Sequence, residues 1–187
     1  MFLLRSNHSW EAVLSKTKAT PTGRESPFSE NEIIVTKTDT KGRLTYANEV
    51  FLRLSRVSLT EAMGQPHSLI RHPEMPRCVF RLLWETLEAK GEFFGYVKNM
   101  ALNGDHYWVF AHATPSFGAN GEVVGYHSNR RKPDPAQIAR IEPVYKRLLE
   151  EERRHGDRKQ GMYAGTDLLN TMLREKGLSY ERFAFSL

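Results

Sequence analysis

The stretch that decides the fold is residues 94–130, which read FGYVKNMALNGDHYWVFAHATPSFGANGEVVGYHSNR. Three runs rich in β-branched and aromatic residues, at 94–100, 106–114 and 122–130, are separated by short segments that contain Asn-Gly. Both of these Asn-Gly pairs, at 103–104 and 120–121, predict tight reversals, because asparagine and glycine readily take positive φ. The sequence therefore predicts a three-stranded antiparallel meander.

Two shorter strands are expected before the meander. Residues 33–38 (IIVTKT) and 43–46 have strand composition, and the turn-forming DTKG at 39–42 joins them. Asn48 follows and predicts the start of a short helix. Residues 60–63 predict another short helix that ends at Gly64.

A longer helix is expected over residues 76–90, where apolar side chains recur every three or four positions and Gly91 ends the run. The segment before it, 65–76, contains three prolines, and X-Pro steps disfavour regular helix there. Taken together, these elements predict an α+β fold with an antiparallel sheet of about five strands flanked by short helices.

The two ends of the chain differ from the middle. Residues 15–30 are polar and contain Pro and Gly, which predicts a linker or a loosely held arm, preceded by a helical turn around Trp10. Asp134-Pro135 predicts a helix start, and Pro143 should kink that helix or reset its start. A polar break is expected at 153–160, and a last amphipathic piece at 167–187. The predicted organisation is an arm (1–30), a sensor-sized domain (31–133) and a C-terminal helical extension (134–187).

Composition excludes several classes of protein. The 187 residues are 40% hydrophobic and 26% charged, enough for a packed core. The net charge of +5 is spread along the chain rather than concentrated, which argues against nucleic-acid binding. No run approaches the length needed to span a bilayer. With a single cysteine, Cys78, no intramolecular disulfide is expected, and we expect a reducing, cytoplasmic location.

No hydrolase, phosphate-loop or zinc-protease motif is present in the sequence. Cys78 falls in the predicted long helix, where a buried apolar role is favoured over a nucleophile. His67 and His72 flank the irregular segment, but their spacing matches no common metal-ligand pattern. Arg71, His72 and Glu74 lie together and either grip a phosphate or form a loop held by a local Arg71–Glu74 pair; the residues alone favour neither reading.

Aromatic residues surround the predicted long helix and meander, and amide side chains lie among them. Such stripes are more often core than a cofactor site. A flat heterocycle nevertheless needs apolar walls with a few placed polar groups, which the amides Asn48 and Asn99 would supply.

Several strings resemble the PAS domain of bacterial aerotaxis receptors. They are YANE around Asn48, GQPH at 64–67, RHPEMP at 71–76, VKN at 97–99, NGDHYW at 103–108 and IEPVYK at 141–146. The similarity covers about residues 30–150. It implies a PAS fold that holds FAD non-covalently and reports cellular redox state.

The resemblance also implies site residues. Positions matching His67, Arg71, His72 and Glu74 are needed for FAD in that family, with aspartate at the last of them. Phe94 stands where the family has a tryptophan important for the flavin, and Trp84 matches a tryptophan of the long helix. Asn48 and Asn99 match positions tied to signalling. We expect the flavin to lie between the 76–90 helix and the sheet, with its adenosine diphosphate end near Arg71 and His72.

Aerotaxis receptors continue into a membrane anchor and a chemoreceptor signalling coil, so this chain resembles a stand-alone version. It implies a separate membrane-bound chemoreceptor-like partner, no enzymatic turnover and no membrane insertion of its own. The terminal residues 178–187 would then be a docking or dimerisation surface, and the seam at 134–150 permits a homodimer. The alternatives are a haem-binding gas sensor using His67, His72 or His112, and a ligand-free interaction module. A cysteinyl photosensor would need Cys78 in a sequence context that it lacks.

Overall fold

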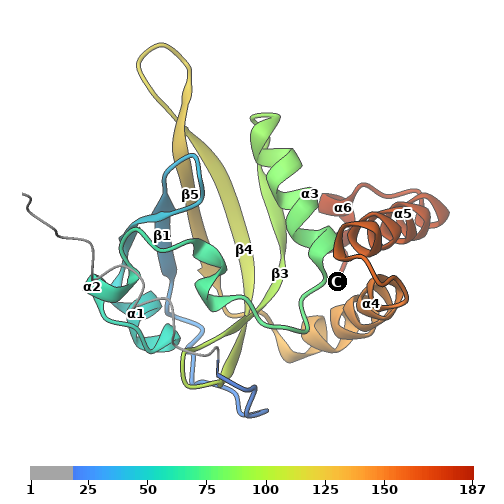
Figure 1. Cartoon of the computed structure of the whole chain (residues 1–187), viewed down its shortest axis with the longest axis horizontal. Helices are drawn as coiled ribbons and strands as arrows, with labels where there is room; N and C mark the ends of the chain where they lie inside the picture. The colour runs from blue at the N-terminus through green and yellow to red at the C-terminus, as the bar shows by residue number, and fades with distance from the viewer. Residues whose placement is uncertain (1–18) are drawn as a thin grey trace, which may run out of the picture.

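The computed structural model describes residues 19–187, and its centre is a five-stranded antiparallel sheet. The strand order is β2-β1-β5-β4-β3, so β2 and β3 are the edges (Figure 1). The strands are β1 (Ile34–Thr38), β2 (Leu44–Ala47), β3 (Phe93–Met100), β4 (His106–Phe117) and β5 (Val123–Arg131). The predicted α+β class and the antiparallel five-stranded sheet are therefore confirmed. The helical turn expected around Trp10 lies outside the described residues.

The predicted meander forms as β3-β4-β5. Phe93 pairs with Ala113 at one end of the first hairpin and Met100 with His106 at the other. Gly104 and Gly121, the glycines of the two Asn-Gly pairs, have φ of 89° and 77°. A side chain at Gly104 would also collide with the carbonyl oxygen of Thr20, so this turn requires glycine for two reasons.

Six α-helices and one 3₁₀ helix are assigned within residues 19–187. They are α1 (Glu49–Ser55), α2 (Leu59–Ala62), η1 (His67–Ile70), α3 (Arg77–Glu88), α4 (Pro135–Arg153), α5 (Arg158–Lys176) and α6 (Tyr180–Phe185). Helix α3 lies over one face of the sheet, and α4, α5 and α6 gather beyond the β3 edge (Figure 1). The irregular segment expected at 65–76 contains only the one short 3₁₀ turn.

Helix α4 runs through Pro143 as one helix, so the proline does not reset its start, and a kink there stays a prediction. The extension differs from expectation at α5, which begins at Arg158, inside the stretch expected to be a polar break. Asp157 explains the early start, because its side chain accepts hydrogen bonds from the backbone N–H groups of Lys159 and Gln160. Helices α4 and α5 pack against each other, and α5 also packs against α3.

The described part of the N-terminal arm was expected to be loosely held, but it forms hydrogen bonds to the β3–β4 turn. The backbone of residues 22–26 follows the β3–β4 turn, with Thr22 N donating to Gly104 O (3.0 Å) and Ser26 N to His106 O (2.7 Å). Asp105 accepts from the Thr22 hydroxyl (2.5 Å) and from Arg24 Nε (3.2 Å). The backbone and polar side chains of the arm therefore form hydrogen bonds with the β3–β4 hairpin.

Among residues 19–187, no helix is both long and apolar enough to cross a membrane.

Candidate functional site

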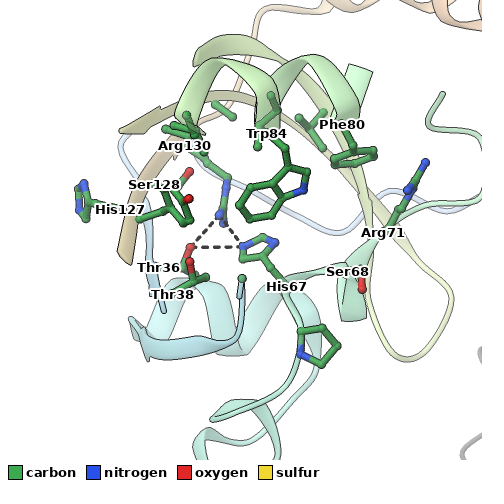
Figure 2. A pocket seen from close by; sticks show the side chains of 18 of the residues that line it. Thr36, Thr38, His67, Ser68, Arg71, Phe80, Trp84, His127, Ser128 and Arg130 are labelled. Carbon is green, nitrogen blue, oxygen red and sulfur yellow. Dashed lines mark hydrogen bonds between the residues drawn. The ribbon is translucent and has the colours of Figure 1, made fainter. Parts of the chain in front are cut away.

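A cavity of about 350 Å³ lies between α3 and the sheet. Its walls come from four parts of the fold: α3, the face of the sheet beneath it, the η1 segment and the β1–β2 turn (Figure 2). Apolar and aromatic side chains form the α3 wall, and polar side chains gather on β1, β5 and η1. A pocket of this kind suits a flat ligand with a polar edge.

Trp84 dominates the apolar wall. Its ring meets Tyr126 of β5 edge-on, with centroids 5.3 Å apart and planes at 74°. Gly42 in the β1–β2 turn has φ of 73°, and a Cβ there would lie 3.0 Å from the indole, so glycine gives Trp84 its room. At the other end, the Arg71 guanidinium sits 4.2 Å over the ring of Phe80. The ring and the cation together form the rim of the cavity (Figure 2).

The polar wall is built around a buried cation, Arg130 of β5, which is 5% exposed. Its Nη2 lies 2.7 Å from Thr36 Oγ1 and 2.6 Å from His67 Nε2, and the dashed lines of Figure 2 join the three residues. A guanidinium can only donate, so His67 Nε2 accepts and its proton is on Nδ1. Burial and the Arg130 charge lower the pKa of His67 to about 3, and burial lowers the pKa of Arg130 to about 10. At neutral pH the histidine is therefore neutral and the arginine charged.

Three residues of the cavity wall carry a buried polar atom that has no hydrogen-bond partner within residues 19–187. These atoms are Thr38 Oγ1, Asn99 Nδ2 and Arg130 Nη1. A buried donor without an acceptor costs about 1–3 kcal/mol, so these atoms indicate a ligand that supplies acceptors. The carbonyl oxygens and ring nitrogens of a flavin are such acceptors, and the apolar wall suits its ring system. The residues present therefore fit the group that the resemblance implies.

Half of the predicted site residues line this cavity: His67, Arg71, Trp84 and Asn99. Asn99 is 4% exposed, and its backbone pairs with that of Arg71 in an isolated antiparallel bridge. The bridge ties the η1 segment to β3, which brings Arg71 and Asn99 to one end of the cavity. That each of these residues contacts a cofactor stays a prediction.

The other half do not line the cavity. Asn48 caps α1: its Oδ1 accepts from Phe51 N and Val35 N, both at 3.1 Å, while its Nδ2 donates to Ile33 O at 2.8 Å. These bonds fix the junction between β1 and α1. Asn48 thus has a structural role that requires no contact with a ligand.

His72 and Glu74 lie beyond Arg71, outside the cavity. His72 is 2% exposed and its Nδ1 accepts from Glu74 N at 3.1 Å. The Glu74 carboxylate pairs with Lys98 Nζ at 2.5 Å, and this hydrogen bond lowers the Glu74 pKa. Of the two alternatives left open for this segment, the local Arg71–Glu74 pair is not the one that forms at Glu74, whose partner is Lys98 of β3. Contact with a ligand at these positions needs a ligand that reaches past the rim.

Phe94 points to the opposite face of the sheet. Val97 and Asn99 line the cavity, and Phe94 is an odd number of residues away from both, so its side chain alternates to the far side. There it stacks on His112 with centroids 4.3 Å apart and contacts Phe185 of α6 at 5.0 Å. The phenylalanine therefore helps to dock the C-terminal helix.

Sequence reasoning missed Arg130 and Thr36, which form the polar wall. The signal for Arg130 was available: Tyr126, Ser128 and Arg130 alternate along a predicted strand and so share one face. What the sequence did not show was that this face lies under α3. Only the pairing of β5 between β1 and β4 places Arg130 beside Thr36.

Cys78 is buried in α3 and does not line the cavity. Burial raises the pKa of its thiol, and Glu152 adds to that effect. Among residues 19–187, no group of three or more His, Cys, Asp or Glu side chains has the arrangement of a metal site.

Comparison with known proteins identifies the fold that carries this cavity. A family model described as PAS fold matches residues 44–130, the segment from β2 to the end of β5. The chain has a PAS fold. A solved light-oxygen-voltage domain, from a study of a flavin analogue, superposes with a TM-score of 0.52 at 18% identity, covering 66% of this chain and 87% of that one. At that identity the likeness concerns the fold alone.

Two curated relatives are signalling proteins by name. This chain is 39% identical to the aerotaxis receptor of Escherichia coli over 127 residues, which are 68% of this chain and 25% of the receptor. It is 29% identical to a nitrogen fixation regulatory protein of Klebsiella pneumoniae over 99 residues, 53% of this chain and 20% of that protein. The chain thus spans a quarter or less of the relatives that it matches.

Proposed function

We propose that this chain is a PAS redox sensor that binds FAD non-covalently in the cavity under α3 and signals to a separate chemoreceptor-type transducer. The observation that carries the proposal is the set of unpartnered buried polar atoms on the cavity wall, which belong to Thr38, Asn99 and Arg130. The similarity to the aerotaxis receptor supports the redox role and the kind of partner. We place the sensor in residues 31–133 and the output in 134–187, in the cytoplasm and with no reaction to catalyse.

The residues of the polar wall would recognise the ring. Arg130 is held by Thr36 and His67 through Nη2, which leaves Nη1 as a fixed donor. Neither Thr36 nor the neutral His67 offsets the positive charge of Arg130. This charge favours a ligand whose hydrogen-bond acceptor edge gains negative charge. Bound FAD would supply a ring nitrogen that accepts a hydrogen bond when oxidised and donates one when reduced.

Asn99 is the residue suited to read that difference. Its amide carries a donor and an acceptor on one planar group, and rotation by 180° exchanges them. Nδ2 has no partner within residues 19–187, so no hydrogen bond from that atom opposes the rotation. Only a side chain that interacts differently with the two redox forms can shift a signalling equilibrium.

A short path leads from Asn99 to the C-terminal helices. Three residues earlier in β3, the carbonyl of Tyr96 accepts a hydrogen bond from Tyr145 Oη of α4 at 2.6 Å. Tyr145 Oη also lies 3.1 Å from Tyr180 Oη of α6, whose ring stacks on Phe93 of β3. A change in β3 therefore reaches α4 and α6 through buried contacts, and residues 178–187 are the proposed docking segment.

The first test is the visible absorption spectrum of the purified protein before and after dithionite. A two-banded flavin spectrum that bleaches on reduction is expected, and heat release with chromatography identifies FAD or FMN. A spectrum without visible bands, also after incubation with FAD, would contradict the proposal and favour a ligand-free interaction module.

The relay has its own test. Asn99→Ala should keep the flavin but reduce the difference in transducer binding between oxidised and reduced protein. Redox-dependent binding of normal size in this variant would show that Asn99 is not the relay. Deleting residues 178–187 should weaken transducer binding in both redox states, and unchanged capture would rule out docking there.

A haem-binding sensor is the second candidate, since His67 lines the cavity. Its Nε2 already accepts from Arg130, and His112 lies on the other face, 2.7 Å from Glu92 Oε2. His72 is outside the cavity as well. The geometry therefore favours flavin, and a sharp Soret band in the same spectrum would reverse that preference.

A further inference from the structure

Helix α3 forms a wall of the cavity with one face and packs against α5 with another. The α3 residues that line the cavity are Phe80, Leu83, Trp84 and Leu87. Figure 2 shows the rings of Phe80 and Trp84 on this face. On the side of α5, the Arg81 guanidinium lies 4.3 Å over the ring of Tyr163. A shift of α3 against α5 therefore moves the cavity wall.

The first turn of α3 is held by a residue of another helix. Pro76 stands at the N-cap position and provides no side-chain cap. The carboxylate of Glu152, near the end of α4, accepts from Arg77 N at 2.9 Å and from Cys78 N at 2.8 Å. N–H groups in the first turn of a helix have no partner within that helix, so they need one from outside. Glu152 therefore ties α4 to the end of α3 that lies about one turn before Phe80.

Helix α5 encloses the same glutamate. A Cβ at Gly161 would collide with the carbonyl oxygen of Glu152, and a Cβ at Gly165 would lie 2.8 Å from Glu152 Cγ and 3.3 Å from Cys78 Sγ. Only glycine lets the helices approach this closely. Glu152 is buried, and a buried carboxylate depends on its hydrogen-bond donors because little water solvates it. Helices α3, α4 and α5 thus meet at one buried charge, beyond the β3 edge of the sheet (Figure 1).

We propose that Glu152 is a positioning residue for the cavity, and that the docking of the α4–α5 hairpin (135–176) sets the affinity of the cavity for its ligand. Glu152 does not line the cavity, so it acts through α3. Without the cap, the first turn of α3 frays, and only the molecules with an intact wall bind ligand. The coupling is reciprocal, so a ligand under α3 strengthens the docking of the hairpin by the same factor. This inference rests on the proposed function for the identity of the ligand, FAD.

The experiment measures FAD binding to flavin-free protein by quenching of flavin fluorescence, with variants that circular dichroism shows to be folded. Glu152→Gln should weaken FAD binding about fivefold to fiftyfold, although this residue does not line the cavity. Glu151→Gln removes the neighbouring carboxylate, which pairs with Arg154 at 2.8 Å, and as the matched control it should stay within about twofold of wild type. Equal FAD affinity of Glu152→Gln and wild-type protein would overturn the proposal and leave the proposed function intact.

A second variant separates the cap from a general loss of stability. Pro76→Ser, added to Glu152→Gln, places a hydroxyl at the N-cap of α3, where φ of −58° and ψ of 141° already suit a capping serine. This local cap should restore part of the FAD affinity without restoring the link to α4. If hydrogen exchange shows the first turn of α3 protected again while FAD binding stays weak, the effect does not pass through α3 and the proposal is wrong.

The reciprocal effect is measured by hydrogen exchange and mass spectrometry. Saturating FAD should slow exchange in α5 (Arg158–Lys176) of wild-type protein and slow it much less in Glu152→Gln. Exchange in α5 that does not respond to FAD in wild-type protein would contradict the coupling.

If wild-type protein binds no FAD, the proposed function fails, and near-ultraviolet circular dichroism of the flavin-free protein decides the positioning role alone. The Trp84 signal is the difference between each protein and the same protein with Trp84→Phe. Glu152→Gln should change this signal and Glu151→Gln should not. A Trp84 signal that Glu152→Gln leaves unchanged would overturn the proposal.

Discussion

Glu152 of α4 provides the strongest single prediction, because it caps another helix. Helix α3 begins after Pro76, which offers no side-chain cap, and Glu152 supplies two oxygens to the N–H groups of Arg77 and Cys78. Glu152 is buried, with 7% of the residue exposed. Glu152 of α4 therefore caps the N-terminus of α3 in place of a local side chain. Its negative charge also lies at the positive end of the α3 dipole.

The magnitude follows from what Glu152→Gln removes. Glutamine keeps one acceptor oxygen and turns an N–H₂ group toward a backbone N–H, so one charge-assisted hydrogen bond is lost and one donor is left facing another. Hydrogen bonds to charged groups contribute about 1.5–3 kcal/mol, and an unmet buried donor costs about 1–3 kcal/mol. We expect the free energy of unfolding to fall by about 2–4 kcal/mol, which for a chain of this size lowers the Tm by about 5–15 °C.

Urea denaturation of flavin-free protein, followed by tryptophan fluorescence and circular dichroism, measures the effect. Glu151→Gln is the control: its carboxylate binds Arg154 at 2.8 Å, whose side chain is 73% exposed, and such a surface pair contributes under about 1 kcal/mol. If Glu152→Gln lowers the free energy of unfolding by no more than Glu151→Gln does, the cap does not stabilise α3 and the reasoning is wrong.

Three further outcomes are expected. The pKa of His67 is about 3 in the folded protein and about 6.5 in the unfolded chain, so below pH 6.5 the unfolded chain binds a proton that the folded protein does not. Between pH 7 and pH 5 the free energy of unfolding should therefore fall by up to about 2 kcal/mol, as measured by urea denaturation at each pH, and His67→Gln should lack this fall. Gly165→Ala places a methyl 2.8 Å from the α4 glutamate and should cost about 1–3 kcal/mol by urea denaturation, whereas Gly156→Ala, which meets open space, should cost less than about 0.5 kcal/mol. Tyr145→Phe leaves the buried Tyr96 carbonyl without its hydroxyl donor and should lower the free energy of unfolding by about 1–3 kcal/mol; an unchanged melting temperature would contradict this.

Most of the fold could be predicted from short-range signals in the sequence. Asn48 was expected to start a helix, and its Oδ1 does accept from Phe51 N. The Asn-Gly pairs were expected to reverse the chain, and Gly104 and Gly121 do so with positive φ. In each case a short-range steric or hydrogen-bonding preference determines the structure, so a single sequence is enough to predict it.

What the sequence could not provide depends on contacts between distant residues. The early start of α5 has a local signal in the N-cap residue Asp157, but the close packing of Gly161 and Gly165 against Glu152 of α4 could not be predicted from any local pattern. The flavin was expected between the long helix and the sheet, where the cavity lies, and its binding there stays a prediction. The cation on its wall is Arg130, more than 60 residues after His67, and only sheet pairing brings the two together. Phe94 has a different reason: it was assigned to the site from the resemblance, although alternation along β3, a local pattern, turns its side chain to the face opposite to Asn99.

The outer edge of β3 has one further consequence. An edge strand normally offers unpaired backbone groups to which another strand can bond. Here Tyr96 O accepts from the Tyr145 hydroxyl, Lys98 N donates to Met75 Sδ at 3.2 Å, and α6 lies alongside. Side chains thus occupy the places that a sixth strand would need, and the sheet is closed to growth from that end. A chain shortened before α4 keeps Met75 but loses the Tyr145 hydroxyl and α6, and its preparations should form β-rich aggregates at concentrations where the full chain does not.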